Sequence, residues 1–374
     1  MMRIGFDGKR AISNYTGLGN YSRDTIRILA HYFKNNQYLL YTSTGNINDR
    51  LPFIANNKNI VINQPRSLFD KTFKTYWRSK NIVKDLSANK IDIYHGLSNE
   101  LPIGIEKTSI KTIVTIHDLI FMRFPHLFNI LDRNIYYRKS KSACQRANKI
   151  IAVSNQTKKD IVKFLNIPEE KITIIYQGCN QVFQQDIGVK KQQSIIKKYR
   201  LPKDYLLYVG TIEERKNLLT LLKALKDLTK EKLIIIGDGK AYKKKCLKFI
   251  AKHKLSERVF FLSGLSPEEI ATVYRSAEIM IYPSIFEGFG IPIIEALFCK
   301  TPVITTKGGC FAEAGGENSQ YINPLSVVEI KAAIMRIKQC DETRNNMISK
   351  GLEYAQKFTD KKVADSLMKV YTNL

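Results

Sequence analysis

The sequence has 374 residues, 44% of them hydrophobic, which is enough for roughly two or three domains with sizeable cores and excludes a disordered chain. It has no run of about 18 apolar residues, and the charged start of the chain lacks the apolar stretch of a signal peptide, so we expect a cytoplasmic protein without a transmembrane helix. The formal net charge of +26 predicts either a polyanionic partner, such as nucleic acid or an anionic membrane, or only a lysine-rich composition.

Short β-rich runs alternate with helical patterns along the first half of the chain. Several of these runs are almost continuously apolar, as expected for strands that are buried on both faces of a sheet. The predicted strands are Arg3–Asp7, Tyr38–Tyr41, Ile91–Tyr94, Lys111–Ile116, Lys149–Val153 and Ile172–Tyr176. Helices are predicted between them, for example over Asn20–Tyr32 and Asp132–Ala147.

The second half repeats this alternation after a polar stretch without clear periodicity, around Gln181–Gln193. Its predicted strands are Tyr205–Val209, Lys232–Ile236, Val259–Leu262, Ile279–Tyr282 and Pro302–Thr305. Its predicted helices are Leu218–Leu228, Pro267–Ser276, Pro292–Phe298 and Val327–Gln339, and the tail Glu342–Leu374 is helical by pattern. The alternation predicts two parallel sheets, whose ligands bind at the carboxyl ends of the strands, and a cleft between the domains is the expected site.

The most informative segment leaves the predicted strand at Tyr282, passes through a glycine-bearing loop and enters a helix whose first turn holds Pro292. Backbone N–H groups at this helix start, with the loop glycines, suit a diphosphate. Glu287 in the loop and Glu295 in the helix would repel phosphates, so they suit sugar and ribose hydroxyls. The alternative for Glu295 is that it only complements the helix dipole.

This segment resembles glycosyltransferase family 4, retaining enzymes of the GT-B fold, through Glu287 and Glu295 at E-x7-E spacing within P-S-x-x-E-G-F-G-I-P-x-x-E-A. The resemblance covers nearly the whole chain, and the order of its pieces is highly specific. Its other pieces are Gly17-Leu18-Gly19-Asn20-Tyr21, His95-Gly96 with Leu101-Pro102, His117-Asp118-Leu119, Val153-Ser154, Val209-Gly210-Thr211, Glu214-Arg215-Lys216-Asn217, Thr301-Pro302-Val303-Ile304 and Glu313-Ala314-Gly315-Gly316.

The resemblance implies an α/β protein of GT-B class, with two Rossmann-like domains whose parallel sheets face a central cleft. It implies an acceptor-side domain over 1–183, a nucleotide-sugar donor domain over 190–355, and a tail helix, 356–374, that packs back on the first domain. The chain departs from the family at Asn180, where an acid usually ends the motif N-G-V-D. This departure concerns the hinge region or the donor contacts rather than the fold.

Arg215 and Lys216 follow a predicted strand and a short loop, where two adjacent cations can grip a diphosphate and stabilise its charge as it leaves. The family's lysine at this place contacts the donor diphosphate, which implies that role for Lys216 and extends it to Arg215. The alternative is a solvated basic turn. With Glu287 and His117, these two residues form the implied catalytic set. The implied donor-binding set is Gly17, Gly19, Gly210, Thr211, Gly288, Phe289, Gly290, Ile291 and Glu295.

Two further pieces lie in the first half. Gly17 and Gly19 resemble a truncated dinucleotide fingerprint without its third glycine, which is poor support for NAD. The family resemblance implies instead a flexible loop near the reacting sugar, and a simple tight turn is the alternative. His117 ends a predicted strand and by resemblance lies beside the donor sugar, while a structural histidine is the alternative. Asp118 is expected to cap or orient the following loop.

The resemblance implies a retaining hexosyltransferase of surface polysaccharide, such as lipopolysaccharide, acting on a glycan or lipid-linked glycan acceptor. GDP-mannose is the favoured donor, because Gly5-Phe6-Asp7 and the T-G-x-G-N-Y pattern that starts at Thr16 resemble bacterial mannosyltransferases of polysaccharide assembly. Rhamnosyl and glucosyl donors stay open. In the family's favoured mechanism, the acceptor hydroxyl attacks on the face that the diphosphate leaves, the leaving phosphate takes the proton, and Glu287 steadies the positive charge.

The alternatives are an NDP-sugar epimerase of the same fold and a basic nucleic-acid-binding protein. The second lacks RNP aromatics and a zinc framework, so no nucleic-acid partner is predicted. The chain has no D-x-D and no G-x-x-x-x-G-K-[ST], and its six cysteines include no C-x-x-C pair. We therefore expect no metal and no cofactor, with the nucleotide sugar as co-substrate and the cysteines as reduced thiols.

Basic residues alternate with aromatic ones in two stretches of the first domain, a pattern that suits an anionic membrane surface. The first stretch holds Arg66, Phe69, Lys71, Phe73, Lys74, Tyr76, Trp77, Arg78, Lys80 and Lys84. The second holds Arg123, Phe124, Arg133, Tyr136, Tyr137, Arg138, Lys139 and Lys141. The hypothesis is peripheral docking on the inner face of the cytoplasmic membrane, to reach a lipid-linked acceptor. The alternative is a solvated basic face with its aromatics in the core.

Overall fold

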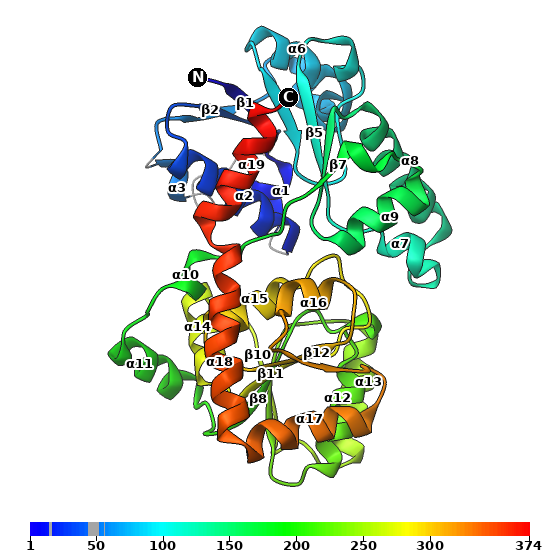
Figure 1. The fold of residues 1–374 in the computed structure, drawn as a ribbon. Helices are drawn as coiled ribbons and strands as arrows, with labels where there is room; N and C mark the ends of the chain where they lie inside the picture. The colour runs from blue at the N-terminus through cyan, green and yellow to red at the C-terminus, as the bar shows by residue number, and fades with distance from the viewer. Residues whose placement is uncertain (15–16, 44–51, 56) are drawn as a thin grey trace. The chain divides into compact units, whose positions relative to one another are not determined.

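The computed structural model describes residues 1–14, 17–43, 52–55 and 57–374. The chain divides into two compact units, of which the first is Met1–Gly178 with Asp360–Leu374 and the second is Cys179–Thr359. Each unit is built on one parallel sheet with helices on both faces (Figure 1). The α/β class with two Rossmann-like units is therefore confirmed.

In the described part of the chain, the sheet of the first unit has the strand order β3-β2-β1-β4-β5-β6-β7, with every pair parallel. The strands are β1 (Arg3–Asp7), β2 (Gln37–Tyr41), β3 (Ile60–Asn63), β4 (Ile93–Gly96), β5 (Lys111–Ile116), β6 (Lys149–Ala152) and β7 (Ile172–Ile174). The order reverses between β1 and β4, so the carboxyl ends of these two strands open the crevice where such sheets bind ligands.

The helices of the first unit cover both faces of this sheet. They are α1 (Lys9–Ser13), α2 (Gly17–Tyr32), α3 (Pro52–Ala55), α4 (Leu68–Thr72), α5 (Lys74–Tyr76), the π-helical turn η1 (Trp77–Asn81), α6 (Ile82–Ala88), η2 (Ile105–Lys107), α7 (Ile120–Arg123), η3 (Pro125–Leu127), α8 (Ile130–Arg146), α9 (Asn155–Leu165), η4 (Glu169–Lys171) and α19 (Asp360–Thr372). Neighbouring residues of β5 belong to the two hydrophobic cores on opposite faces of the sheet. Ile113 packs in the core with α2 and α19, and Val114 packs in the core with α6 and α8.

The C-terminal helix α19 belongs to the first unit and packs along α2 (Figure 1). Arg27 of α2 forms an ion pair of 2.8 Å with Asp360, the first residue of α19. Arg27 also pairs with Asp24 of its own helix at 3.3 Å. Burial raises the pKa of Asp24 to about 6 despite the neighbouring guanidinium. The end of the chain is thus held by charge as well as by apolar packing.

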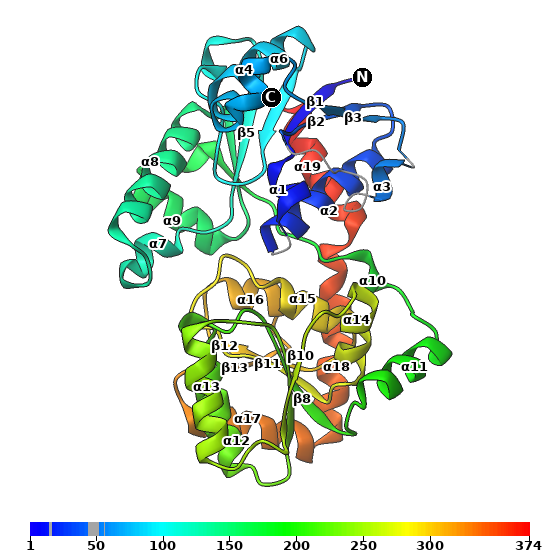
Figure 2. The same cartoon turned by 180° about the vertical axis from the view of Figure 1, so that it is seen from behind.

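The sheet of the second unit has the order β10-β9-β8-β11-β12-β13, again parallel throughout the described residues (Figure 2). Its strands are β8 (Tyr205–Val209), β9 (Lys232–Ile236), β10 (Val259–Leu262), β11 (Ile279–Tyr282), β12 (Val303–Thr306) and β13 (Gln320–Ile322). Its helices are α10 (Gln181–Gln184), α11 (Val189–Tyr199), η5 (Glu214–Lys216), α12 (Leu218–Asp227), α13 (Ala241–Lys252), α14 (Pro267–Ser276), α15 (Ile291–Phe298), α16 (Cys310–Gly315), α17 (Val327–Gln339), α18 (Asp341–Ala355) and η6 (Gln356–Phe358). Here the order reverses between β8 and β11.

The polar stretch around Gln181–Gln193, which shows no clear periodicity in the sequence, contains α10 and the start of α11. Tertiary contacts explain this helix, because Phe183 is buried against Tyr274 and Arg275 donates to the carbonyl of Phe183. The side chain of Asn180 caps α10 by accepting from the N–H of Val182. No helix in the described ranges is both long and apolar enough to cross a membrane.

Candidate active site

Two glycines shape the loops that follow β8 and β9. Gly210 and Gly237 have φ values of 146° and 152°, a region that favours glycine. A Cβ atom on Gly237 would lie 2.0 Å from the carbonyl oxygen of Gly210. The two backbones are therefore so close that only glycine fits at position 237. The chain then passes exposed Thr211 and turns through η5, which presents Arg215 and Lys216.

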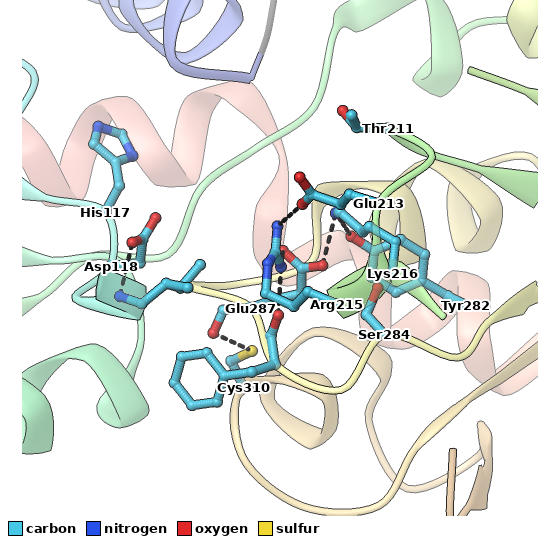
Figure 3. Close-up of polar contacts among 12 residues, drawn as sticks. His117, Asp118, Thr211, Glu213, Arg215, Lys216, Tyr282, Ser284, Glu287 and Cys310 are labelled. Carbon is cyan, nitrogen blue, oxygen red and sulfur yellow. Dashed lines mark hydrogen bonds and ion pairs between the residues drawn. The ribbon is translucent and has the colours of Figure 1, made fainter. Parts of the chain in front are cut away.

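Arg215 and Lys216 both form ion pairs with Glu287 (Figure 3). Lys216 Nζ lies 2.6 Å from Oε1 of Glu287, and Arg215 Nη1 lies 2.8 Å from Oε2. Glu287 is only 8% exposed. Arg215 also pairs with Glu213 at 2.5 Å and donates to the carbonyl of Phe286. The structure therefore brings together three of the four residues that the sequence predicts as catalytic.

The two cations determine the charge state of Glu287. Burial alone would raise the pKa of this carboxyl, but the ion pairs with Lys216 and Arg215 outweigh it and hold the pKa below its ordinary value. In return, Glu287 raises the pKa of Arg215 although desolvation opposes this. Glu287 is consequently a carboxylate at neutral pH, with both oxygens in ion pairs.

Tyr282 is a site residue that the sequence reasoning did not assign. It ends β11, and its hydroxyl accepts a hydrogen bond of 2.6 Å from Nζ of Lys216 (Figure 3). Burial and the nearby Glu287 raise its pKa well above the ordinary value, so it stays a neutral phenol. An ammonium has three N–H donors. Among the residues that the structure describes, Lys216 donates to Tyr282 and forms the ion pair with Glu287, which leaves donor capacity for an anionic ligand.

The loop after β11 leads into α15 at Gly290, whose φ of 129° favours glycine. Helix α15 begins at Ile291 without a side-chain cap and holds Pro292 in its first turn, as the sequence predicts. Within the loop that precedes α15, the carbonyl of Glu287 accepts a hydrogen bond of 3.2 Å from Sγ of Cys310 (Figure 3). This contact ties the carboxylate-bearing loop to α16.

The other predicted donor-binding residues of this loop differ in their surroundings. Gly288 is half-buried, whereas Phe289 is buried and packs against Phe358, with ring centroids 5.8 Å apart. Glu295 is half-buried and accepts a hydrogen bond of 2.8 Å from Tyr274. It lies beyond the first turn of α15, which contains no acidic residue, so complementing the helix dipole does not explain it.

His117 lies in the first unit, directly after β5, and both of its ring nitrogens have partners. Nε2 lies 2.8 Å from the carbonyl oxygen of Leu97, which can only accept, so this nitrogen carries the proton. Nδ1 lies 2.9 Å from the side-chain nitrogen of Gln177, which donates to it. Burial lowers the pKa of His117 to about 4. The ring is therefore neutral, and its basic nitrogen is already occupied.

Gln177 is a second residue that sequence reasoning did not assign to the site, although it lies in the Tyr176–Asn180 stretch that departs from the family. The sequence feature that could have identified Gln177 is its position three residues after the end of β7, because ligands bind at the carboxyl ends of parallel strands. Asp118 accepts a hydrogen bond of 3.0 Å from the N–H of Ile120, which confirms the expected local role.

The expected flexible loop at Gly17 and Gly19 is wrong, because both residues lie in the first turn of α2. A Cβ atom on Gly19 would lie 1.9 Å from the carbonyl oxygen of Asn14, so this glycine permits close packing of the chain before α2. A Cβ atom on Gly17 would meet nothing within 4 Å. Thr16, which begins the mannosyltransferase-like pattern, lies outside the described residues.

A buried polar chain lies beside His117. Tyr371 of α19 contacts Nδ1 of His95 at 2.6 Å, and Nε2 of His95 contacts the hydroxyl of Thr115 at 2.8 Å. Thr115 in turn lies 3.0 Å from the hydroxyl of Tyr21, whose ring packs edge-on against His117 with centroids 4.6 Å apart.

Among the described residues, no group of His, Cys, Asp and Glu side chains could hold a metal ion.

Comparison with known proteins agrees with this architecture. Residues 17–181 match the family Glycosyltransferase Family 4, and residues 190–354 match Glycosyl transferases group 1. O-antigen chain mannosyltransferase B of Escherichia coli is 26% identical over 360 residues, which cover 92% of each chain. A glycosyltransferase structure from Rickettsia africae has a TM-score of 0.76 at 19% identity, covering 100% of this chain and 98% of that one. Alr3699/HepE of Anabaena in complex with UDP-glucose has a TM-score of 0.78 at 16% identity, covering 100% of both chains. This chain therefore belongs to the glycosyltransferases of the GT-B fold, with a family 4 domain followed by a group 1 domain.

Proposed function

We propose that this glycosyltransferase moves a mannosyl residue, with retention, from GDP-mannose to a glycan or lipid-linked glycan acceptor in surface polysaccharide synthesis. The observation that carries the proposal is the pairing of Lys216 and Arg215 on buried Glu287, where the strand order reverses between β8 and β11. The name of the Escherichia coli relative supports mannose and a polysaccharide acceptor. The UDP-glucose complex of the Anabaena protein supports a nucleoside-diphosphate sugar as donor.

The cations would act on the diphosphate as it leaves. Breaking the bond between the sugar carbon and the phosphate places negative charge on the phosphate oxygens, and preorganised donors stabilise that charge. Lys216 retains donor capacity for this task among the described residues, and α15 begins at Ile291 without a side-chain cap, so the N–H of Ile291 can add a backbone donor. Arg215 is held by Glu213, Glu287 and the Phe286 carbonyl, so it mainly braces the loop and adds charge.

The ion pairs of Glu287 favour front-face attack over a covalent intermediate. A carboxylate with both oxygens in ion pairs is a weak nucleophile, although it can still stabilise positive charge on the sugar. In the front-face route the bond from the sugar carbon to the phosphate breaks as a bond to the acceptor oxygen forms. The acceptor proton then moves to the leaving phosphate. His117 would contact the donor sugar without moving a proton, because its basic nitrogen already accepts from Gln177.

A thermal-shift screen against nucleotide sugars tests the donor, because a ligand that binds only the folded protein raises its melting temperature. We expect GDP-mannose to raise the melting temperature of the wild type more than UDP-glucose or an NDP-rhamnose does, and to raise that of Lys216→Ala less. NMR of the product tests the stereochemistry, since retention predicts the anomeric configuration of the donor. A product of inverted configuration, or free epimer formed without acceptor, contradicts the proposal.

We also propose that the first unit docks on an anionic membrane surface. Phe69 and Phe73, from the first basic and aromatic stretch, are 52% and 54% exposed and pack on each other with centroids 4.7 Å apart. Exposed lysines, among them Lys71 and Lys74, flank them. Trp77 does not belong to this surface, since it is 1% exposed. Exposed aromatic rings beside cations suit the headgroup region of an anionic bilayer.

Co-sedimentation with liposomes tests this docking. We expect binding to anionic vesicles that weakens at high salt, and weaker binding to neutral ones. Replacing Phe69 and Phe73 together by alanine should reduce the bound fraction. The matched control replaces Leu325 and Val328, exposed apolar residues of the second unit, and should change nothing. Equal binding to both vesicle types, or none, would leave the net charge as a feature of composition.

A further inference from the structure

The first unit contains a cavity of about 310 Å³ that does not include any residue of the proposed donor site. Its walls come from β1 and β4, from α5 and η1, from the chain after β4, and from α8. The π-helical turn η1 contributes Arg78 and Ser79. Such turns are rare and often occur at functional sites.

Four cations line this cavity and face two carboxylates. Arg78 pairs with Asp7 and Glu100, both at 2.6 Å. Lys139 of α8 shares Glu100 at 3.0 Å, and Arg146 donates to the carbonyl of Leu101 at 3.0 Å. The charge of the lining is therefore positive, and these contacts hold three of the cations in place.

Arg138 is the fourth cation, and it differs from the others. It lies on α8, is exposed, and its guanidinium has no partner among the described residues. A guanidinium presents paired N–H donors that match two oxygens of a phosphate. Arg138 can thus turn to an anionic ligand without breaking an existing ion pair.

Part of the cavity wall is apolar. This part is formed by Tyr94, Leu101, Pro102 and Ile103, of which Ile103 is exposed. The same wall is joined to the exposed aromatic cluster, because Thr75 of α5 lines the cavity and the next residue, Tyr76, packs edge-on against Phe69 with centroids 5.9 Å apart. A ligand with a phosphate next to a hydrocarbon chain matches this combination, whereas a free anion would leave the apolar wall unused.

We propose that this cavity binds the phosphate group of a lipid-linked acceptor, with the hydrocarbon chain along the apolar wall toward Phe69 and Tyr76. The proposal rests on the proposed function, in which the acceptor is a lipid-linked glycan. Arg138 is the residue expected to close on the phosphate. Arg78 and Lys139, both paired with Glu100, contribute further positive charge.

Isothermal titration of the full chain with farnesyl diphosphate, a short isoprenyl diphosphate, tests this site. Inorganic diphosphate and farnesol are titrated in parallel, so that the anion and the hydrocarbon are measured separately. We expect farnesyl diphosphate to bind at least about tenfold more tightly than either, because it uses both walls. Arg138→Ala should weaken this binding by about ten- to hundredfold, the range for a lost hydrogen bond to a charged group.

Two control variants show whether the loss of affinity is specific to the cavity. Arg133→Ala removes the same charge from the same helix outside the cavity lining, and should leave the affinity for farnesyl diphosphate unchanged. Lys216→Ala should also leave it unchanged, which separates this cavity from the proposed donor site. Equal losses in Arg138→Ala and Arg133→Ala overturn the proposal, as does binding of inorganic diphosphate that matches the lipid. Loss in Lys216→Ala alone would place the ligand at the donor site and overturn it as well.

The measurements distinguish a failure of this cavity assignment from a failure of the proposed function. If GDP-mannose shifts the melting temperature of Arg138→Ala as it does that of the wild type, the donor site is intact whatever the cavity binds. If farnesyl diphosphate binds through Arg138 but no nucleotide sugar stabilises the wild type, the cavity assignment stands and the proposed donor fails.

Discussion

Gln177 donates a hydrogen bond of 2.9 Å to Nδ1 of His117, while Nε2 of the same ring donates to the carbonyl of Leu97 at 2.8 Å. The imidazole is thereby fixed in one neutral tautomer and one orientation. A histidine held in this way can present its edge to a ligand, but it has no free lone pair with which to take a proton. The structure thus favours contact over proton transfer for this residue.

The stability of the protein should depend on pH through His117. Burial lowers the pKa of this ring to about 4, below its ordinary value of 6.5, so the folded state excludes the proton that the unfolded state binds. The contribution of His117 to the free energy of unfolding is complete above pH 6.5. It is lost as the pH falls toward 4, at up to about 1.4 kcal/mol per pH unit. Urea unfolding at pH 7.5, 6 and 5 measures this slope.

His117→Gln is the variant that isolates the effect. Its free energy of unfolding should fall less steeply below pH 6.5 than that of the wild type. The comparison is needed because His95, with a pKa lowered by burial to about 3, adds to the slope, whereas Asp24, with a pKa raised to about 6, opposes it. Identical slopes in the variant and the wild type would contradict the buried neutral state of His117.

Glu287→Ala should nearly abolish transfer and lower stability. The substitution removes the carboxylate that Lys216 and Arg215 share, and breaking a buried ion pair from one side costs about 3 kcal/mol or more. Activity is therefore measured at a temperature where circular dichroism shows the variant folded. Glu287→Gln keeps the shape but not the charge and should lose transfer as well. Wild-type turnover in either variant would remove Glu287 from the mechanism.

Glu295→Ala should weaken the binding of GDP-mannose by about ten- to hundredfold, the range for losing hydrogen bonds to a charged group, with less effect on turnover. Tyr274→Phe is the matched control, because it removes the 2.8 Å hydrogen bond to Glu295 and leaves the carboxylate in place. Its affinity should change by less than about tenfold. If Glu295→Ala lowers only the melting temperature, Glu295 supports Tyr274 and does not contact the donor.

Transfer should survive chelation. The sequence lacks D-x-D, and the described residues contain no cluster of metal ligands, so Lys216, Arg215 and the start of α15 are expected to stabilise the diphosphate. The rate is compared before and after dialysis against EDTA. Complete loss of activity that returns with added divalent metal would show that a cation performs this task.

The sequence predicted those strands that are buried on both faces. Tyr205–Val209 and Ile279–Tyr282 match β8 and β11, two central strands whose almost continuous apolar runs indicate burial on both faces. It missed β3 and β13, short strands at the edges of their sheets, where Val61 is exposed and Gln320 is half-buried. The edge strands β7 and β10 were predicted, because both are mostly apolar, whereas β3 ends in Asn63 and β13 begins with Gln320.

The sequence identified several candidate residues of the site, but it did not predict the contacts between them. Glu287 and Lys216 were assigned separately to sugar and phosphate, and their ion pair spans 71 positions in the sequence, which no local pattern encodes. Gly19 was assigned to a flexible loop, yet the nearby carbonyl of Asn14 explains it as a packing residue. Tyr282 and Gln177 were missed because aromatic and amide residues at strand ends are common without being functional.

The binding of a nucleoside diphosphate to Lys216 is the central claim, and isothermal titration with GDP measures it most directly. Lys216→Ala should weaken GDP binding by at least about tenfold, since it removes a charge-assisted hydrogen bond. Lys223→Ala, which removes an exposed lysine of the same unit from α12, should bind GDP as the wild type does. Unchanged affinity in both Lys216→Ala and Arg215→Ala would show that these cations only balance Glu287, and would contradict the account of the donor site.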